Sequence, residues 1–202
     1  MITIIDYGLG NVFSMKNALD VIGVPVCISR EPKDIESAEK LILPGVGAFK
    51  DGMENLARFG LIAPLTRQVV HEKKPILGVC LGMQLFASMG EEHGQVEGLG
   101  WIEGNARRFT VDESRFRIPH IGWNEVFPRT GAKLFEEHTH PVFYFAHSFH
   151  LVPKDPSVIS AQGDYGEPFV ASIEKENIFG VQFHPEKSQQ AGLTLLERFA
   201  RL

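Results

Sequence analysis

One of the two cysteines stands in a frame that suits a nucleophile. Cys80 is the centre of Gly78-Val79-Cys80-Leu81-Gly82, a G-x-C-x-G pattern between an apolar run and a helical pattern. The related G-x-S-x-G elbow places its nucleophile on a sharp turn between a strand and a helix, and flanking glycines allow the close backbone approach of such a turn. Amides at the start of the following helix would favour the reactive thiolate. The pattern predicts nucleophilic catalysis by Cys80. The alternative is a cysteine that acts as a small buried hydrophobe.

A thiolate nucleophile works with a base, and the base with a group that orients it. Among the eight histidines, His184 follows the apolar run Ile178–Phe183 and precedes Pro185, which favours extended geometry at His184. Side chains two positions apart in an extended segment point the same way, so Glu186 would fix the tautomer of His184. Sites in parallel α/β sheets gather beyond the carboxyl ends of strands. We expect Cys80 and His184 to meet there if their strands are neighbours; otherwise His184 is a loop histidine beside a solvated carboxylate.

Acyl transfer to a thiol also needs N–H donors for the oxyanion that develops on the substrate. Gly45 and Gly47 flank Val46 directly after a predicted strand, so this backbone is free to turn its amides toward a site. The N–H of Leu81, the residue after the nucleophile, is the second expected donor. Taken alone, Pro44-Gly45-Val46-Gly47 fits an ordinary loop equally well.

The elements that would position these groups follow from the spacing of apolar residues. Strands are expected at Ile2–Asp6, Val24–Ser29, Lys40–Leu43 and Pro75–Val79. Helices are expected over Gly52–Phe59, Leu61–His71 and Leu81–Ser88, together with a helical face formed by Val12, Met15, Leu19 and Ile22. Strands that alternate with helices predict a parallel sheet covered by helices.

The second half of the chain has a different pattern. After a loop-like stretch over Gly94–Gly104, short strands are expected with few helices between them, which favours local antiparallel pairing. These strands are Asn105–Phe109, Glu125–Phe127, Val142–Ala146, Val158–Ala161, Phe169–Ile173 and Ile178–Phe183. A last helix over Gln189–Leu202 would place Leu193, Leu196, Phe199 and Ala200 on one face.

Composition excludes several classes of protein. The chain has 202 residues, of which 44% are apolar and 22% charged, as in globular proteins rather than disordered or coiled-coil ones. One domain spanning 1–202 is expected. A net charge of −5 argues against broad binding to nucleic acids or anionic membranes. Two cysteines favour a reducing cytoplasm over a disulfide framework, and Cys27 fits a structural role inside a strand. No apolar run reaches the ~20 residues of a membrane span.

Taken together, the motifs resemble a known family. The segments Gly78–Gln84 and Val181–Ser188 are similar to the class I (triad) glutamine amidotransferases. Further motifs are Asp6–Asn11, Pro44–Phe49, Pro119–Asn124 and Tyr144–Ser148. Within the family these motifs most resemble the glutaminase subunits of histidine biosynthesis. The resemblance implies a flavodoxin-like α/β fold, with a central, mostly parallel sheet flanked by helices and an added antiparallel portion in the C-terminal half.

The resemblance also assigns expected roles within the site. Cys80 would attack the carboxamide of L-glutamine and form a glutamyl thioester, His184 would shuttle protons, and Glu186 would orient His184. Residues 45–47 match the family's mobile oxyanion segment. Positions that hold the glutamine head correspond to Gln84 and Glu92, and the backbone that grips its α-carboxylate side corresponds to Ser148 and Phe149. Many relatives have Tyr where this chain has Phe149. No cofactor or metal is implied.

A partner protein is implied as well. Free ammonia becomes mostly ammonium in neutral water, so the family passes it directly to a synthase. Here the implied partner is a cyclase subunit, a separate (β/α)8 barrel of about 250 residues that this chain cannot contain. The two chains would form a heterodimer that makes imidazole glycerol phosphate and aminoimidazole carboxamide ribotide. The expected docking residues are Asn11, Trp123, Tyr144 and Lys187. Trp is frequent among interface hot spots, but Trp123 and Tyr144 could also belong to the core and Lys187 to a solvated surface.

Two other functions remain open. A paralogous subunit would keep the glutaminase chemistry and donate ammonia to an amidino-sugar pathway of surface polysaccharides. A catalytically silent regulatory subunit would keep the fold alone, although the intact Cys80, His184 and Glu186 argue against this. Three further patterns carry less weight. For the histidines at 138, 140, 147 and 150, loop and core positions are expected rather than a metal site. For the arginines at 107, 108, 115 and 117, a solvated surface is expected rather than a phosphate site, and the G-x-G at residues 8–10 lacks the third glycine of a dinucleotide-binding loop.

Overall fold

The computed structural model describes residues 1–202 and is built around one eight-stranded sheet. The strand order is β2-β1-β3-β4-β14-β13-β12-β9. The first five strands run parallel: β2 (Val26–Ser29), β1 (Ile2–Ile5), β3 (Lys40–Gly45), β4 (Ile76–Cys80) and β14 (Ile178–Val181). This order is that of a flavodoxin-like doubly wound sheet, which places candidate sites at the carboxyl ends of its strands.

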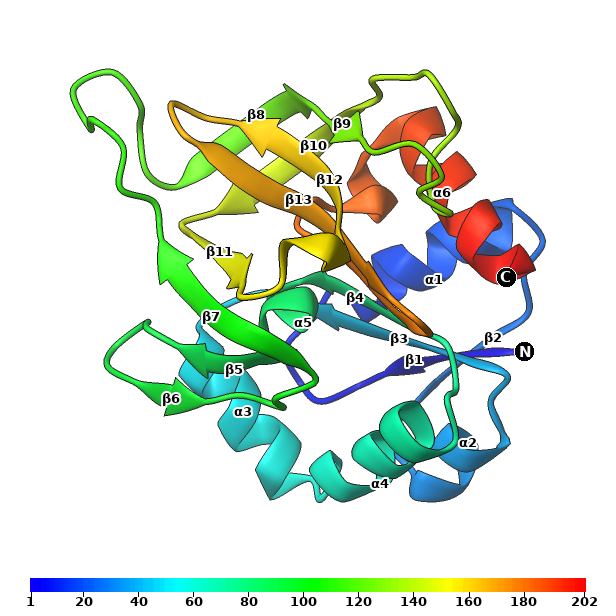
Figure 1. Ribbon diagram of the computed structural model, residues 1–202. Helices are drawn as coiled ribbons and strands as arrows, with labels where there is room; N and C mark the ends of the chain where they lie inside the picture. The colour runs from blue at the N-terminus through cyan, green and yellow to red at the C-terminus, as the bar shows by residue number, and fades with distance from the viewer.

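The sheet continues with antiparallel strands from the second half of the chain. These are β13 (Pro168–Lys175), β12 (Ile159–Asp164) and β9 (Phe127–Pro128). Two smaller sheets lie beside them (Figure 1). One pairs β8 (His120–Glu125) with β10 (Val142–His147), and the other has the order β11 (Phe149–Pro153), β7 (Ile102–Arg108), β5 (Ala87–Gly90) and β6 (Val96–Glu97). The expected parallel sheet with an antiparallel portion is confirmed.

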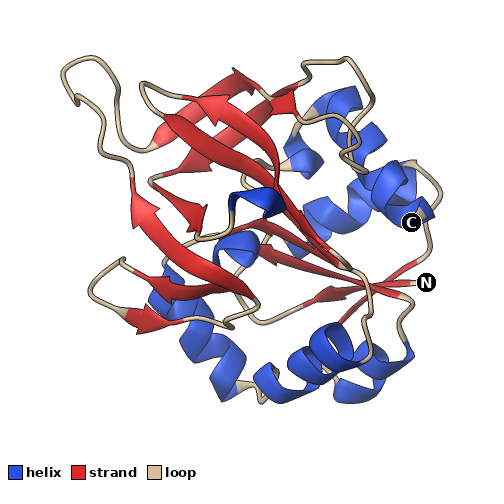
Figure 2. Ribbon diagram, in the orientation of Figure 1, coloured by secondary structure: helices blue, strands red, loops and turns tan.

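Helices cover both faces of the parallel strands (Figure 2). On one side lie α1 (Val12–Val21) and α6 (Gln189–Arg201), which pack against each other. On the other side lie α2 (Pro32–Ser37), α3 (Phe49–Arg58), α4 (Ile62–Thr66) and the short α5 (Leu81–Gln84). A π-helical turn over Arg67–His71 continues α4, and single 3₁₀ turns occupy Pro156–Val158 and Pro185–Lys187. No helix combines the length and the apolar composition needed to cross a membrane.

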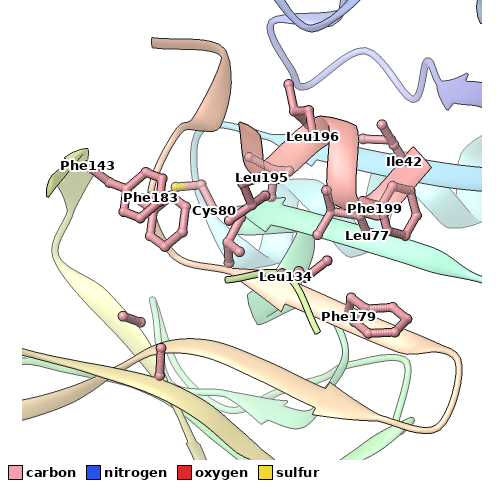
Figure 3. Close-up of a cluster of buried hydrophobic side chains, with 14 of the residues drawn as sticks. Ile42, Leu77, Cys80, Leu134, Phe143, Phe179, Phe183, Leu195, Leu196 and Phe199 are labelled. Atoms are coloured by element: carbon pink, nitrogen blue, oxygen red, sulfur yellow. The ribbon is translucent and has the colours of Figure 1, made fainter. Parts of the chain in front are cut away.

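The inner parallel strands are buried on both faces and divide the interior into two cores, while the edge strand β2 is half-buried. Neighbouring residues of β1 point to opposite sides, so Ile4 joins the core under α1 and α6 while Ile5 joins the core under α2 to α4. In the first core the rings of Phe143 and Phe183 stack with their centroids 3.8 Å apart, and Cys80 borders this cluster (Figure 3). This stack holds the segment that follows β14 against β10.

Three expectations about the elements were wrong. The helix expected over Leu81–Ser88 stops at Gln84, because the chain from Ala87 to Gly90 pairs as β5 with β7 instead. Two strands, β8 and β11, were not expected over most of their length. Both contain His, Gly or Asn and pair with partners far away in sequence, so local composition gives little signal.

Smaller differences concern helices and loops. The helix expected over Leu61–His71 divides into α4 and the π-helical turn, and the stretch Gly94–Gly104 contains β6 and the start of β7. In α6 the expected Leu196 and Phe199 are buried and the expected Leu193 and Ala200 pack half-buried against the same core, while Gly192 and Leu195 are further buried residues. Cys27 lies half-buried in β2, as expected for a structural cysteine.

Candidate active site

The turn at Cys80 is strained and permits no side chain on either flanking glycine. Cys80 ends β4 with φ 54° and ψ −111°, a region that residues with a Cβ rarely adopt. A Cβ at Gly78 would lie 2.6 Å from the ring of Phe86 and 2.7 Å from the amide of Met83. A Cβ at Gly82 would overlap the carbonyl oxygen of Leu43 on the neighbouring strand. The G-x-C-x-G frame therefore forms the sharp strand-to-helix turn that the sequence predicts.

The strands that carry Cys80 and His184 are neighbours. β4 and β14 pair in parallel with Gly78 opposite Gly180 and Val79 opposite Val181. This register brings the next residue, Gln182, beside Cys80, and Gln182 Nε2 donates a hydrogen bond to Cys80 Sγ over 3.6 Å. The chain then reaches His184, which lines the same cavity as Cys80. The condition that the sequence left open, adjacency of the two strands, is met.

His184 and Glu186 form a buried pair at the start of the 3₁₀ turn. His184 Nδ1 lies 2.9 Å from Glu186 Oε1, and both side chains are 3% exposed. Burial alone would lower the pKa of His184, but hydrogen bonds and negative charge from Cys80 and Glu186 outweigh it and raise the pKa to about 10. His184 therefore carries a positive charge at neutral pH, beside the sulfur. Because α5 has only four residues, this charge, rather than a long helix, dominates the electrostatics of the site.

A cavity of about 440 Å³ opens over Cys80 and His184. Its walls come mainly from four regions of the chain, which are the segment after β3, the elbow with α5, the junction of β10 and β11, and the turn after β14. Two single residues complete them, Glu92 after β5 and Pro119 before β8. The lining residues are Val46, Gly47, Ala48, Cys80, Leu81, Gln84, Glu92, Pro119, Ala146, His147, Ser148, Phe149, His184 and Lys187. A space of this size accommodates a small polar substrate beside the sulfur.

The expected oxyanion donors lie on the side of the cavity next to the elbow. Val46, Gly47 and Leu81 line it, and Gly47 has φ 103°, which a residue with a side chain would adopt only with strain. Gly45 lies behind them as the partner of Cys80 in the β3–β4 ladder. The four residues expected to form the oxyanion site therefore lie next to Cys80, at the ends of the neighbouring strands β3 and β4.

The expected glutamine-binding residues also line the cavity. Gln84 donates both amide hydrogens, to the carbonyl oxygen of Phe149 over 2.8 Å and to Gln182 Oε1 over 3.1 Å. Its own amide oxygen is therefore the part of Gln84 left to accept a hydrogen bond from a ligand. Glu92 Oε2 accepts from the backbone N–H of Phe49 at the start of α3, over 2.9 Å. This cap orients Glu92 at the rim. Ser148 and Phe149, which join β10 to β11, line the cavity beside Gln84.

Three of the expected docking residues, Trp123, Tyr144 and Lys187, lie together beside the cavity, and Lys187 also lines it. Trp123 is 50% exposed, so a core position for it is excluded, and its ring packs edge-on against Tyr144 at 6.0 Å. Lys187 Nζ lies 5.7 Å from the centre of the half-buried Tyr144 ring. Asn11 is exposed at the start of α1, where its side chain accepts from the N–H of Ser14.

Sequence reasoning missed several residues of this region. No role was predicted for Gln182, which contacts Cys80, and His147 was expected only in a loop or core position, although it lines the cavity. Ile121 and Val142 extend the exposed apolar surface around Trp123. The strand register supplies the missing signal, since Ile121, Trp123 and Val142 share the outward face of the β8–β10 ribbon. No group of three or more His, Cys, Asp or Glu side chains could hold a metal ion.

Comparison with known proteins identifies the family. The family model described as glutamine amidotransferase class-I matches residues 3–201. The chain belongs to the class-I glutamine amidotransferases. Similar curated proteins named imidazole glycerol phosphate synthase subunit HisH 1, of Campylobacter jejuni, and HisH 2, of Pseudomonas aeruginosa, are 50% and 45% identical, each over 100% of both chains. The protein named subunit HisH of Aquifex aeolicus is 44% identical over 98% of this chain and 95% of its own.

Solved structures agree with this family at the level of the fold. A crystal structure described as glutamine amidotransferase superposes with a TM-score of 0.76 at 18% identity, covering 100% of this chain and 99% of its own. A chain of the structure described as PurLQS from Thermotoga maritima gives 0.76 at 18% identity, over 99% and 97%. The expected resemblance to class I glutamine amidotransferases is thus confirmed.

Proposed function

We propose that this chain is the glutaminase subunit of an imidazole glycerol phosphate synthase, and that residues 1–202 act as one glutamine amidotransferase domain. One observation carries the proposal: a cysteine on a strained strand-to-helix turn and a histidine held by a buried glutamate line the same cavity. The similarity to HisH proteins at 44–50% identity over almost the whole chain supports the histidine-pathway acceptor.

The chemistry begins at the sulfur. Cys80 Sγ attacks the carboxamide carbon of glutamine, and the oxygen of that group becomes an oxyanion. Amides of the 45–47 segment and of Leu81 stabilise this oxyanion. His184, protonated at neutral pH, gives its proton to the leaving nitrogen, so the C–N bond breaks and ammonia departs. The product of this half-reaction is a glutamyl thioester on Cys80.

Water completes the cycle. The neutral His184 takes a proton from water, whose oxygen attacks the thioester carbon, and the C–S bond breaks. Glutamate leaves, and the site returns to its starting protonation state. Glu186 holds Nδ1 of His184 over 2.9 Å, so the other ring nitrogen remains directed to the chemistry. The net reaction converts glutamine and water into glutamate and ammonia without a cofactor.

Substrate recognition uses the glutamine-binding wall, the part of the cavity lining formed by Gln84, Glu92, Ser148 and Phe149. The amide oxygen of Gln84 and the free oxygen of Glu92 offer acceptors for the α-ammonium group of glutamine, while the backbone at Ser148 and Phe149 meets the carboxylate side. This assignment rests on the position of these residues around the cavity and on the family resemblance of the motifs that contain them.

The ammonia acceptor lies on a partner subunit. The names of the relatives describe them as subunits of a synthase, and we infer a HisF-like (β/α)8 cyclase barrel as the heterodimer partner, in the cytoplasm. The outward face of the β8–β10 ribbon supports this inference, because Ile121 and Trp123 are 61% and 50% exposed there. Asn11, Tyr144 and Lys187 would surround this docking face.

Replacing the nucleophile tests the proposal. Cys80→Ala in the complex should abolish glutamine-dependent formation of imidazole glycerol phosphate and leave ammonia-dependent formation intact. Cys27→Ala is the matched control and should leave both reactions unchanged. Loss of both activities in a folded Cys80→Ala complex would mean that Cys80 is structural, and an unchanged glutamine-dependent rate would refute the proposed chemistry.

The acceptor is tested separately. Two of the relatives are named with a numeral, HisH 1 and HisH 2. Because paralogous subunits can share the glutaminase chemistry and differ in the ammonia acceptor, the assay must measure the histidine pathway itself. Expression of this chain with a cyclase subunit should restore growth of a strain that lacks its histidine-pathway glutaminase. Failure with a folded, glutamine-hydrolysing complex would favour an amidino-sugar acceptor, while the glutaminase chemistry would stand.

A further inference from the structure

A pair of buried histidines lies directly behind the glutamine-binding wall. His147 ends β10 and His120 begins β8, and the two residues face each other in the antiparallel register. They are 5% and 3% exposed. His120 Nδ1 lies 3.0 Å from His147 Nε2. Neither histidine takes part in the proposed glutaminase chemistry, although His147 lines the cavity.

The hydrogen bonds around this pair fix the position of every proton. His147 Nδ1 lies 2.9 Å from the carbonyl oxygen of Phe149, which can only accept, so Nδ1 carries the hydrogen. Burial lowers the pKa of His147 well below its usual value and that of His120 to about 4, so both rings are neutral at neutral pH. The unprotonated Nε2 of His147 then accepts from Nδ1–H of His120.

The chain of hydrogen bonds continues along β8 to Asn124. His120 Nε2 is left as an acceptor and faces Asn124 Nδ2 at 3.5 Å. The orientation of the Asn124 amide is set independently, since its nitrogen donates to the carbonyl of Asp164 over 2.7 Å and its oxygen accepts from the N–H of Glu125. A single chain of donors therefore runs from Asn124 through His120 and His147 to the carbonyl of Phe149.

This carbonyl is held from two sides. Gln84 Nε2 donates to it over 2.8 Å, so Gln84 and His147 together saturate the oxygen. The preceding carbonyl, that of Ser148, accepts from the N–H of Phe109 over 3.1 Å. Both carbonyls of the segment that meets glutamine are thus engaged by the protein, and the orientation of the peptide units between them is set.

Aromatic rings hold the relay in place. The ring of His120 stacks on Tyr165 at 4.0 Å and on Phe145 at 5.0 Å, with interplanar angles of 23° and 20°. Tyr165 is itself fixed by a hydrogen bond from its hydroxyl to the carbonyl of Arg117. His120 is therefore clamped, and its Nδ1–H is directed to His147 without freedom to rotate away.

We propose that His147 and His120 are positioning residues for glutamine: they hold the Phe149 carbonyl, and with it the Ser148–Phe149 backbone, in the orientation that binds the substrate. The inference rests on the proposed glutaminase function. His147 acts through the Phe149 peptide, and His120 acts through His147, by fixing its tautomer and its ring orientation.

His150 provides a matched control within the same cluster. It is also buried, at 2% exposed, and its ring stacks on Phe109 at 4.8 Å. Neither of its ring nitrogens has a hydrogen-bond partner, so it is not part of the chain of donors. His150→Phe therefore keeps an aromatic ring against Phe109, replaces a buried imidazole of the same cluster, and leaves the support of the Phe149 carbonyl in place.

Two polar replacements of His147 separate positioning from packing. In His147→Asn the amide nitrogen takes the place of Nδ1 and can still donate to the Phe149 carbonyl. In His147→Gln the amide lies near the place of Nε2, so the contact with His120 is kept and the donor to Phe149 is lost. Both variants bury an amide at the same site, so they share the cost of the substitution itself.

The readout compares two reagents that alkylate Cys80 in the full chain. The chloroketone analogue of L-glutamine carries the α-amino and α-carboxylate groups of the substrate, whereas iodoacetamide carries neither. His147→Gln and His120→Leu should raise the half-saturating concentration of the analogue about tenfold, the cost of one lost hydrogen bond in a buried site. His147→Asn and the control His150→Phe should stay within about threefold of the parent. Iodoacetamide rates should stay within twofold throughout.

Distinct outcomes would overturn the inference. Equal half-saturating concentrations in His147→Gln and His147→Asn would refute the positioning role, and so would an equal effect of His150→Phe. A parallel loss of reactivity toward iodoacetamide would assign the histidines to packing of the site as a whole. If the parent chain itself is not saturated by the analogue, the proposed glutaminase function fails, and this inference fails with it.

Discussion

The side-chain amide of Gln182 joins the sulfur of Cys80 to the residue that faces the substrate. Its nitrogen donates to Cys80 Sγ over 3.6 Å, and its oxygen accepts from Gln84 Nε2 over 3.1 Å. Gln182 is completely buried. The parallel pairing of β4 and β14 places it there. A single buried amide therefore couples the nucleophile to the glutamine-binding wall.

Replacement of Gln182 by Leu should reduce glutaminase activity without unfolding the chain. The variant loses a hydrogen bond to the reacting sulfur, and it leaves Gln84 with a single acceptor. A hydrogen bond to a charged group contributes about 1.5–3 kcal/mol, so we expect kcat/KM to fall roughly ten- to hundredfold. Gln162→Leu makes the same change at an exposed site on β12 and should have no effect. Equal rates for parent and Gln182→Leu would contradict the coupling.

Removal of the charge on Glu186 should change the protonation of His184. Interaction with Cys80 and Glu186 raises the pKa of His184 to about 10, against the effect of burial. Because the folded value exceeds the unfolded value of 6.5, this stabilisation is complete below pH 6.5 and is lost as the pH rises through about 10. Glu186→Gln should lower the pKa of His184, so the loss occurs at lower pH.

NMR of ring-labelled histidine measures this directly. The His184 signal should titrate at a pH lower by about one unit or more in Glu186→Gln, and kcat should fall at least about tenfold because the proton donor is less well oriented. Glu167→Gln is the control, since Glu167 lies near a different buried histidine, His150, at 3.8 Å. A His184 titration that is the same in parent and Glu186→Gln would refute the pairing.

The elbow glycine next to the nucleophile should not tolerate a methyl group. A Cβ at Gly82 would overlap the carbonyl of Leu43, which is fixed in the β3–β4 ladder. Gly82→Ala should therefore lower the free energy of unfolding by about 1–3 kcal/mol or more. Gly52→Ala on α3 is the matched control, because its Cβ would meet only the ends of side chains, those of Leu85 at 3.0 Å and Leu81 at 3.4 Å, and Ala favours a helix. Urea denaturation distinguishes them, and equal midpoints would contradict the steric argument.

Much of the parallel half of the fold could be predicted from the sequence. β-branched runs such as Ile2–Ile5 have strong local signals, and most are followed by a helical period, although the short helix α2 after β2 was not predicted. The Cys80 elbow was recognisable for the same reason, since glycine spacing is local information. The end of α5 could not be predicted, because the apolar periodicity continues past Gln84, whereas the chain from Ala87 onward pairs with β7.

The second half depends on contacts between distant residues, which composition does not encode. The strand His120–Glu125 contains Gly, Trp and Asn, and only its pairing with β10 makes it a strand. For the same reason the relay through His120 and His147 could not be predicted, because 27 residues separate two rings that lie 3.0 Å apart. The role of Gln182 likewise required the β4–β14 register.

Truncation of Trp123 should weaken the complex with the cyclase subunit while leaving the free chain intact. Its exposed ring lies between Ile121 and Tyr144 on the outward ribbon face, where no core contact depends on it. Trp123→Ala should raise the Kd at least about tenfold, as truncation of an aromatic hot spot typically does. Leu202→Ala is the control: it removes an exposed apolar side chain at the C-terminus, after the end of α6 and away from the β8–β10 ribbon (Figure 1). An unchanged Kd in Trp123→Ala would move the docking surface elsewhere.

Replacement of His150 should make the fold less sensitive to acid. Burial, and then the nearby Arg107, lower the pKa of His150 to about 4, while Glu167 opposes the shift. Because the folded value is below the unfolded value of 6.5, the unfolded chain binds the extra proton between pH 6.5 and 4. Stability from this site is therefore present above pH 6.5 and is lost as the pH falls through that window.

Urea unfolding at pH 7 and pH 5 measures this contribution. One proton contributes a slope of about 1.4 kcal/mol per pH unit, so the free energy of unfolding should fall by about 2 kcal/mol less in His150→Phe than in the parent between these two values. The phenyl ring keeps the stacking on Phe109 and removes only the titrating group. An identical fall in both proteins would mean that His150 takes up its proton without unfolding, through an opening of the cluster around Phe109.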